Sequence, residues 1–170
     1  MTQKENCQIF VSKLFAMAKE NPGVRAALRQ ATSPTTETRA WPILIRQNVN
    51  ISSPEKEAYC LVASAIAHSS SEKDGSLSFG KALQRSFENG SENSGAESRL
   101  LRILSCDSIA EVCGVLKPVL RLIESRQPGI LFLGGLLYDL VGFNDDRIRQ
   151  IVKERWATDF YRKEITEDAK

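Results

Sequence analysis

The chain has 170 residues, enough for one domain with a sizeable core or for two small ones, and its 42% hydrophobic and 26% charged residues exclude wholesale disorder. The net charge of +2 is too small to indicate nucleic-acid binding by itself, so a basic surface would require local segregation of charge. No stretch resembles a signal peptide, and the longest apolar run, residues 129–143, is too short to span a bilayer and contains Asp139, so we expect a cytoplasmic protein without a membrane segment.

The first two predicted elements are helices. Phe10, Leu14 and Met17 mark one face of the first, and the sequence "NPG" at 21–23 ends it. Residues 23–34 form the second, which places Arg25 and Arg29 one turn apart on one face. Like charges at this spacing destabilise a helix by a few tenths of a kcal/mol, so the pair requires an explanation.

A strongly apolar helix follows, over residues 53–69, with Ser53 as its N-cap and Pro54 in its first turn. We expect it to be the central core helix. A polar loop and another helix, residues 77–87, come next. The polar stretch 88–98 is the best candidate for a linker, so we predict an N-terminal helical domain over residues 1–90 and a C-terminal helical bundle over 96–170.

The second half reads as further helices. A short one ends near Cys106, and Ser108 and Glu111 have the spacing of a capping box that opens a four-turn helix. Pro118 falls inside that helix, and we predict a kink there. A buried helix ends near Leu140.

The last helix is capped by Asn144 or Asp145. We predict that its inward face consists of Ile148, Ile151, Val152 and Trp156. Because no segment alternates between polar and apolar residues, the fold class is all-α, as two small helical bundles joined by a polar linker.

The chain lacks a recognisable catalytic or metal-binding pattern. Residues 75–82 have the spacing of a phosphate-binding loop, but Ala82 stands where that motif needs a hydroxyl and no strand precedes it. We interpret the only histidine, His68, as a helix-end residue that contacts the last carbonyl groups, and Asp145 and Asp146 as helix-capping acids. The cysteines are expected to be buried free thiols. We therefore predict a non-enzymatic chain with no metal and no other cofactor.

Basic residues recur in pairs at helical spacing. Arg99 and Arg102 stand three residues apart, and the pairs four residues apart are Arg25/Arg29, Lys81/Arg85, Lys117/Arg121 and Arg149/Lys153. With 23 basic residues among 170, chance gives about three pairs at the four-residue spacing, so spacing alone favours an ordinary solvated surface. Arg25 and Arg29 differ, because their helix contains no acid. Two cations one turn apart can contact successive phosphates, and we hypothesise that an anionic strand lies across this pair.

Four stretches, taken together, resemble the CasB family, the small subunit of the type I-E CRISPR surveillance complex Cascade. They are "RAALRQA" at 25–31 with "RAWPIL" at 39–44, "LSFGKALQRS" at 77–86, "ESRLLRILSCDSIAEVCGVLKPVLRLIES" at 97–125 and "VKERWATDFYR" at 152–162. The resemblance covers most of the chain. It lies in the order and spacing of the motifs and in the total length.

The resemblance implies a two-domain, all-α, non-enzymatic subunit that pairs head to tail with a second copy of itself. It implies docking on the backbone and large subunits of Cascade and contact between basic helix faces and the R-loop of guide RNA and target DNA. The expected nucleic-acid-binding residues are Arg25, Arg29, Lys81, Arg85, Arg99, Arg102, Lys117, Arg121, Arg147 and Arg149.

The chain also departs from the family pattern. Lys117–Pro118 stands where some members carry paired arginines, and Ser105 and Ser108 stand where flanking arginines are common. We expect Arg102 and Arg121 to substitute for them. The alternative function is a helical protein–protein adaptor that makes no direct contact with nucleic acid.

Overall fold

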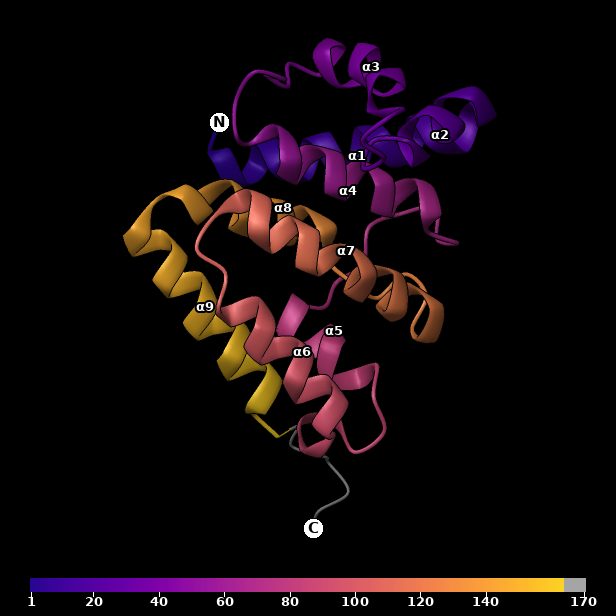
Figure 1. Ribbon diagram of the computed structural model, residues 1–170. Helices are drawn as coiled ribbons and strands as arrows, with labels where there is room; N and C mark the ends of the chain where they lie inside the picture. The colour runs from indigo at the N-terminus through magenta and orange to yellow at the C-terminus, as the bar shows by residue number, and fades with distance from the viewer. Residues whose placement is uncertain (164–170) are drawn as a thin grey trace.

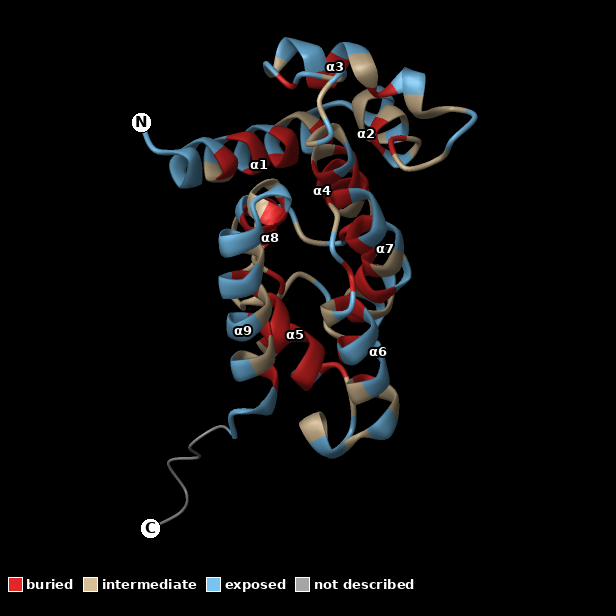
Figure 2. Ribbon diagram, turned by 60° about the vertical axis from the view of Figure 1, so that its left-hand side comes forward, coloured by how far each residue is buried: buried red, intermediate tan, exposed pale blue. Residues whose placement is uncertain are grey.

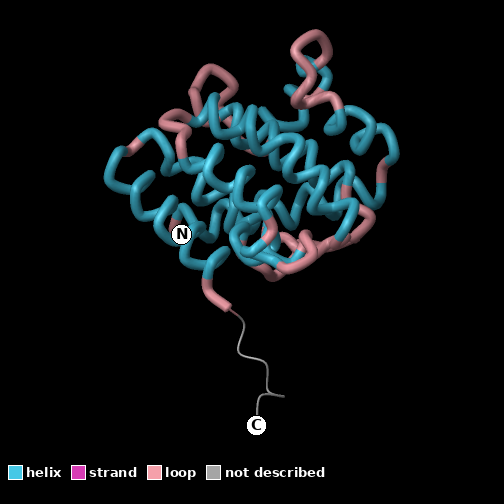
Figure 3. The backbone as a smooth tube through the Cα atoms, turned by 60° about the horizontal axis from the view of Figure 1, so that its bottom comes forward, coloured by secondary structure: helices cyan, strands magenta, loops and turns pink. Residues whose placement is uncertain are grey.

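A computed structural model describes residues 1–163. The predicted all-α class is confirmed, and Figure 3 shows helices joined by loops. Within this range extended backbone pairs only at an isolated parallel bridge between Leu77 and Leu131. The elements are α1 (Gln3–Glu20), α2 (Pro22–Arg29), η1 (Glu37–Arg39), α3 (Trp41–Arg46), α4 (Lys56–His68), α5 (Phe79–Arg85), η2 (Gly90–Glu92), α6 (Ser94–Leu104), α7 (Ile109–Arg126), α8 (Leu133–Val141), η3 (Gly142–Asn144) and α9 (Asp146–Tyr161).

Helix α4 lies at the centre, as the sequence predicts. In Figure 1 the helices α1 to α4 form the upper part of the molecule, α7 and α8 cross its middle, and α5, α6 and α9 form its lower part. Helix α4 packs against α1, α2, α7 and α8, and most of its residues are buried. Figure 2 shows buried positions along α4 and α5 and exposed positions on the outer side of α9.

Side-chain caps fix the N-terminal ends of five α-helices in residues 1–163, namely α1, α2, α6, α7 and α9. Asn21 follows the last residue of α1, and its side chain accepts hydrogen bonds from the first turn of α2. Ser108 and Asp145 cap α7 and α9 in the same way. The predicted cap at Ser53 is wrong for the helix itself. Its hydroxyl accepts a hydrogen bond from the N–H of Glu55 at 3.2 Å within a turn, and α4 begins only at Lys56.

The predicted linker is only partly correct. Residues 94–98 form the first turn and a half of α6, because the Asn93 side chain accepts from the N–H groups of Gly95 and Ala96 and so starts the helix. Helix α5 packs against α9, and a Cβ on Gly80 would lie 2.8 Å from the Cβ of Asp159. Helices from both sides of the expected boundary therefore contact each other. The division into two domains stays a prediction.

Helix α9 buries a narrower face than predicted. Val152 and Trp156 are buried, whereas Ile148 and Ile151 are 44% and 56% exposed. The core face of α9 follows the four-residue spacing of Val152, Trp156 and Phe160. Ile148 covers Gly142 at the edge of the core, and Ile151 lies about 100° around the helix from Val152. Both predictions of an inward position are therefore wrong.

Helix α7 continues from Ile109 to Arg126 through Pro118. The kink stays a prediction. All four cysteines are buried free thiols, as expected. Among residues 1–163 no helix is both long and apolar enough to cross a membrane.

Candidate nucleic-acid interface

Arg25 and Arg29 of α2 reach the C-terminal end of α4. The Nε atom of Arg25 donates to the carbonyl of Ala67 at 2.9 Å, and its Nη2 atom donates to the carbonyl of Ser69. Arg29 is exposed, and its Nε atom donates to the Ala67 carbonyl at the longer distance of 3.4 Å. The last carbonyl groups of a helix lack partners within it and carry its negative dipole end. The two arginines supply donors and positive charge to this end of α4, so the cations of α2 have partners within the chain.

His68 stands beside these arginines as the last residue of α4. Its Nδ1 atom bonds the carbonyl of Ser64 at 2.8 Å, one turn before the end of α4, so the predicted contact with the last carbonyl groups is wrong. Arg25 and Arg29 bond the Ala67 carbonyl in that last turn. Burial lowers the pKa of His68, and repulsion from Arg121, Arg29 and Arg25 lowers it further. The hydrogen bond to Ser64 acts in the opposite direction. The structure thus brings three arginines from two helices to one histidine.

The side chains of three other predicted residues donate hydrogen bonds to backbone carbonyl groups of this chain. The ammonium of Lys81 lies 3.1 Å from the carbonyl of Arg162, and that of Lys117 lies 3.2 Å from the carbonyl of Thr32. Arg149 bonds the carbonyl of Phe143 at 3.1 Å and pairs with Asp146 at 2.8 Å. These cations tie together segments that are distant in the sequence or anchor the start of α9.

Arg85 and Arg99 are exposed on neighbouring helices. The Nη1 atom of Arg99 donates to the carbonyl of Gly95 at 3.0 Å, and its guanidinium lies 5.3 Å from the ring centre of Phe87. Arg126, which the sequence did not single out, lies 4.7 Å from the same ring and bonds the carbonyl of Ser86. The Phe87 ring therefore contacts two guanidinium groups, one from α6 and one from α7.

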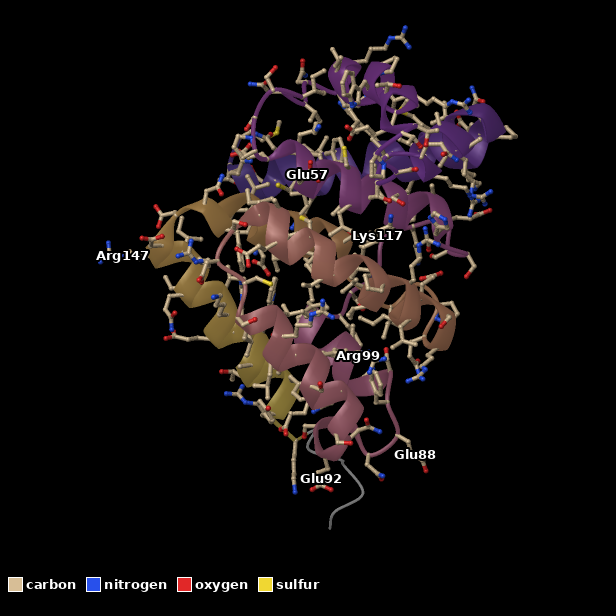
Figure 4. The ribbon with its side chains drawn as sticks, in the orientation of Figure 1. Glu57, Glu88, Glu92, Arg99, Lys117 and Arg147 are labelled. Atoms are coloured by element: carbon tan, nitrogen blue, oxygen red, sulfur yellow. The ribbon has the colours of Figure 1, made fainter. Side chains whose placement is uncertain are left out.

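The remaining predicted residues are Arg102, Arg121 and Arg147. Each is exposed, and none makes a side-chain hydrogen bond or ion pair within the described part of the chain. Figure 4 places Arg99 and Lys117 on α6 and α7 toward the viewer, and Arg147 at the far left near the start of α9. The predicted residues therefore do not form one continuous patch.

A cavity opens beside the end of α4. Its floor is apolar and includes Phe15, Leu61 and Leu120, while cations from α7 and from the loop before α5 stand among its lining residues. The polar and charged lining residues are Ser64, His68, Ser69, Lys73, Lys117, Arg121 and Glu124. Sequence reasoning assigned His68 only a capping contact, because its neighbours come from α2 and α7, more than 35 residues away in either direction.

Burial raises the pKa of all four thiols. Burial raises the pKa of Cys60 and of Cys113 to about 12, so these thiols are protonated at neutral pH and are poor nucleophiles. Among residues 1–163 no three metal-ligating side chains gather in one place.

One family model and three solved structures are similar to this chain. A family model described as CRISPR-associated protein Cse2 matches residues 24–161. A CRISPR-associated protein of the Cse2 family from Thermus thermophilus has a similar fold, with a TM-score of 0.73 at 23% identity over 95% of this chain and 99% of that one. CasB from Thermus thermophilus and CasB from M. ruber each give a TM-score of 0.70 at 23% identity. The first of these two comparisons covers 95% of this chain and 99% of the other, and the second covers 92% of each. No curated protein sequence matches significantly.

Proposed function

Because the chain belongs to the CRISPR-associated Cse2 family, we propose that it is the small, non-catalytic subunit of a Cascade surveillance complex and that its exposed cations contact the phosphates of the R-loop. In such a complex base pairing with the guide RNA reads the target sequence. The exchange of one duplex for another is nearly balanced in free energy, so protein–phosphate contacts can tip it. Its partners are the backbone and large subunits and a second copy of this chain.

The proposed phosphate contacts are supported by a set of exposed cations that have no acidic partners among the described residues. Arg102, Arg121 and Arg147 are exposed on helices and make no ion pair within the described residues. Phosphate contacts by such residues are independent of sequence and depend steeply on salt. This is the kind of contact that a subunit needs when the guide RNA supplies the specificity.

Residues that donate to carbonyl groups of this chain have a different part in the proposal. Arg25, Lys81 and Lys117 hold α2, α5 and α7 in place. Their main contribution is to the positions of the helices that carry the exposed cations. Phosphate contact by Arg29 remains part of the proposal, because Arg29 is exposed and its single hydrogen bond is long.

The hydrogen bonds of these cations to carbonyl groups of their own chain also favour the second candidate, a protein–protein adaptor. A basic residue that already bonds backbone carbonyls is less available for phosphates. Helix α9 exposes Ile148 and Ile151 on neighbouring turns, which gives a protein partner apolar surface to bury. In this alternative the chain joins the same complex and leaves nucleic acid to the other subunits.

Fluorescence anisotropy with unrelated single- and double-stranded DNA across a salt series separates the two candidates. The test variant is Arg102→Gln/Arg121→Gln/Arg147→Gln. The control is Lys13→Gln/Arg39→Gln/Arg46→Gln, which makes the same change in charge at exposed positions of α1, η1 and α3. Each phosphate contact contributes about 0.9 to the logarithmic salt slope on duplex DNA, so the test variant should lower that slope by about two to three.

The outcomes are distinct. A lower slope in the test variant and a smaller change in the control support phosphate contact by these arginines. Equal loss in both variants assigns the binding to net charge alone. If the isolated chain does not bind DNA at low salt, the same variants are measured in the reconstituted complex. Unchanged DNA binding there refutes the phosphate contacts and favours the adaptor.

A further inference from the structure

Cations from two neighbouring helices converge on the C-terminal end of α4. Helix α4 packs against both α2 and α7. Arg25 and Arg29 of α2 bond the carbonyl of Ala67, the residue before His68, and Arg121 of α7 lines the same cavity as His68. All three arginines repel a positive charge on His68. Because Arg121 has no partner within residues 1–163 and Arg29 has one long hydrogen bond, both can accept an anion. Arg25 is already bound to two carbonyl groups.

The hydrogen bond of His68 fixes which ring nitrogen is free. A carbonyl oxygen can only accept a hydrogen bond, so the Nδ1 atom that lies 2.8 Å from the Ser64 carbonyl carries a proton. In the neutral ring the Nε2 atom is therefore the unprotonated one. It makes no hydrogen bond within the described part of the chain, and the His68 side chain lines the cavity beside α4. Protonation of Nε2 would turn this edge of the ring into a charged donor.

The acids around this cavity are already engaged. Glu124 accepts from the N–H groups of Ser70 and Gly129 at 2.8 and 3.0 Å, and Glu72 pairs with Lys19 at 3.0 Å. In the same loop Asp74 accepts hydrogen bonds from its neighbour Gly75 and from the N-terminal turn of α8. The cations of the cavity wall are Lys73, Lys117 and Arg121. Positive charge therefore exceeds negative charge at the end of α4, and the nearby carboxylates are held by other donors.

We propose that the end of α4 is a phosphodiester site in which Arg29, Arg121 and His68 hold one phosphate group of a nucleic-acid backbone, and that His68 takes up a proton from solvent when the phosphate binds. This inference rests on the proposed function and names the place where the nucleic acid is held. A phosphodiester suits the site because its tetrahedral oxygens accept hydrogen bonds from several directions, and the donors come from α2, α4 and α7. A planar carboxylate is best satisfied by the fork of a single arginine.

The proposed site predicts that the phosphate binds more tightly at lower pH. In the free protein burial and the arginines keep His68 neutral at neutral pH. A phosphate beside the ring favours the charged form and raises its pKa, typically by one unit or more. The bound protein then holds one more proton than the free protein, so binding tightens as pH falls through the pKa of the complex. The strengthening stops below the pKa of the free protein.

Proton NMR of His68 tests the inference directly, because this chain contains one histidine. The imidazole signal is titrated with pH in the full chain, with and without a short oligothymidylate, whose phosphodiesters and bases do not titrate in this range. We expect the pKa of His68 to rise by about one pH unit, which corresponds to about tenfold tighter binding at acidic pH. Arg121→Gln should reduce the rise, and the matched variant Arg46→Gln, at an exposed position of α3 outside the proposed phosphate contacts, should leave it unchanged.

Anisotropy on the same samples separates the possible failures. In His68→Gln the affinity near pH 7.5 should stay within about twofold of the unmodified protein, while the gain at acidic pH is lost. Oligothymidylate that binds without moving the pKa of His68 overturns this inference and leaves the proposed function standing. If the isolated chain does not bind oligothymidylate at low salt, His68→Gln is measured in the reconstituted complex, where a gain at acidic pH equal to that of the unmodified protein overturns this inference. A larger pKa rise with a polyglutamate peptide than with oligothymidylate assigns the site to an acidic protein and also overturns the inference.

Discussion

Replacing Arg25 with alanine tests why two arginines share a short helix without an acid. The guanidinium of Arg25 donates to the carbonyl groups of Ala67 and Ser69, at the end of the central helix α4. The first contact joins residues 42 positions apart in the sequence. In Arg25→Ala the two carbonyls lose a charged donor, and the negative end of the α4 dipole loses a nearby cation. The fold should therefore lose stability even though the residue lies near the surface.

The size of the loss follows from these contacts. A hydrogen bond to a charged group contributes about 1.5–3 kcal/mol when both groups leave water, and a cation at a helix C-terminus about 0.3–1 kcal/mol. Arg25 is half-buried, so water can reach part of the vacated site. We expect the free energy of unfolding to fall by about 2 kcal/mol. For a chain of this size that corresponds to a decrease in Tm of about 4–8 °C.

Urea unfolding followed by circular dichroism gives the free energy, and its slope shows whether the transition remains two-state. Arg29→Ala is the matched variant one turn away. Its single 3.4 Å hydrogen bond comes from an exposed side chain, so its loss should cost about 0.5 kcal/mol. Arg46→Ala removes an exposed arginine that has no partner within the described residues, and it should change stability by less than about 0.5 kcal/mol.

Equal effects from the variants at Arg25 and Arg29 would refute the reasoning, because the two side chains differ mainly in the carbonyl groups that they reach. A loss below about 0.5 kcal/mol in Arg25→Ala would do the same. The sequence-based hypothesis of an anionic strand across the pair would then regain its original support, since the missing acid in α2 would again need an external explanation.

Three further predictions concern packing, pH and thiol chemistry. Gly80→Ala should destabilise the fold by about 2 kcal/mol or more, because a Cβ there meets Asp159 and the backbone of α9. Gly114→Ala has open space around it and should stabilise α7 by about 0.5–1 kcal/mol. Thermal melts that rank the two variants the other way contradict the α5–α9 contact. The pKa of His68 lies below its usual 6.5 in the folded chain, so the unfolded chain binds the proton first as the pH falls. The stability of the fold should therefore decrease as the pH drops below about 6.5. Thermal melts of His68→Gln should lack this loss, and an equal loss in both proteins assigns it to other groups. The native protein should react slowly with Ellman's reagent at pH 8, because burial shields the thiols and raises their pKa. Four thiols per chain should react only after denaturation. Fast reaction in the native state contradicts their burial. These thiols are Cys7, Cys60, Cys106 and Cys113.

The sequence by itself determined the fold class and the starts of α7 and α9. Phe10 and Leu14 are buried on one face of α1, and Ser108 and Asp145 cap the helices that follow them. These features are readable because a cap or an apolar period acts within one or two turns of the chain. The order of the CasB-like motifs indicated the family in the same way, since motifs and their spacing are properties of the sequence.

Only the tertiary structure decided what each cation and each apolar side chain contacts. Ile148 and Ile151 follow the helical pattern, but Ile148 lies at the edge of the core beside Gly142, and Ile151 lies about 100° around α9 from the buried Val152. Spacing on a helix shows that two arginines are neighbours. It does not show whether they face solvent, a phosphate or a carbonyl group of a distant helix. That choice depends on how α2, α4 and α7 pack, because their contacts join residues dozens of positions apart, beyond the range of any local pattern.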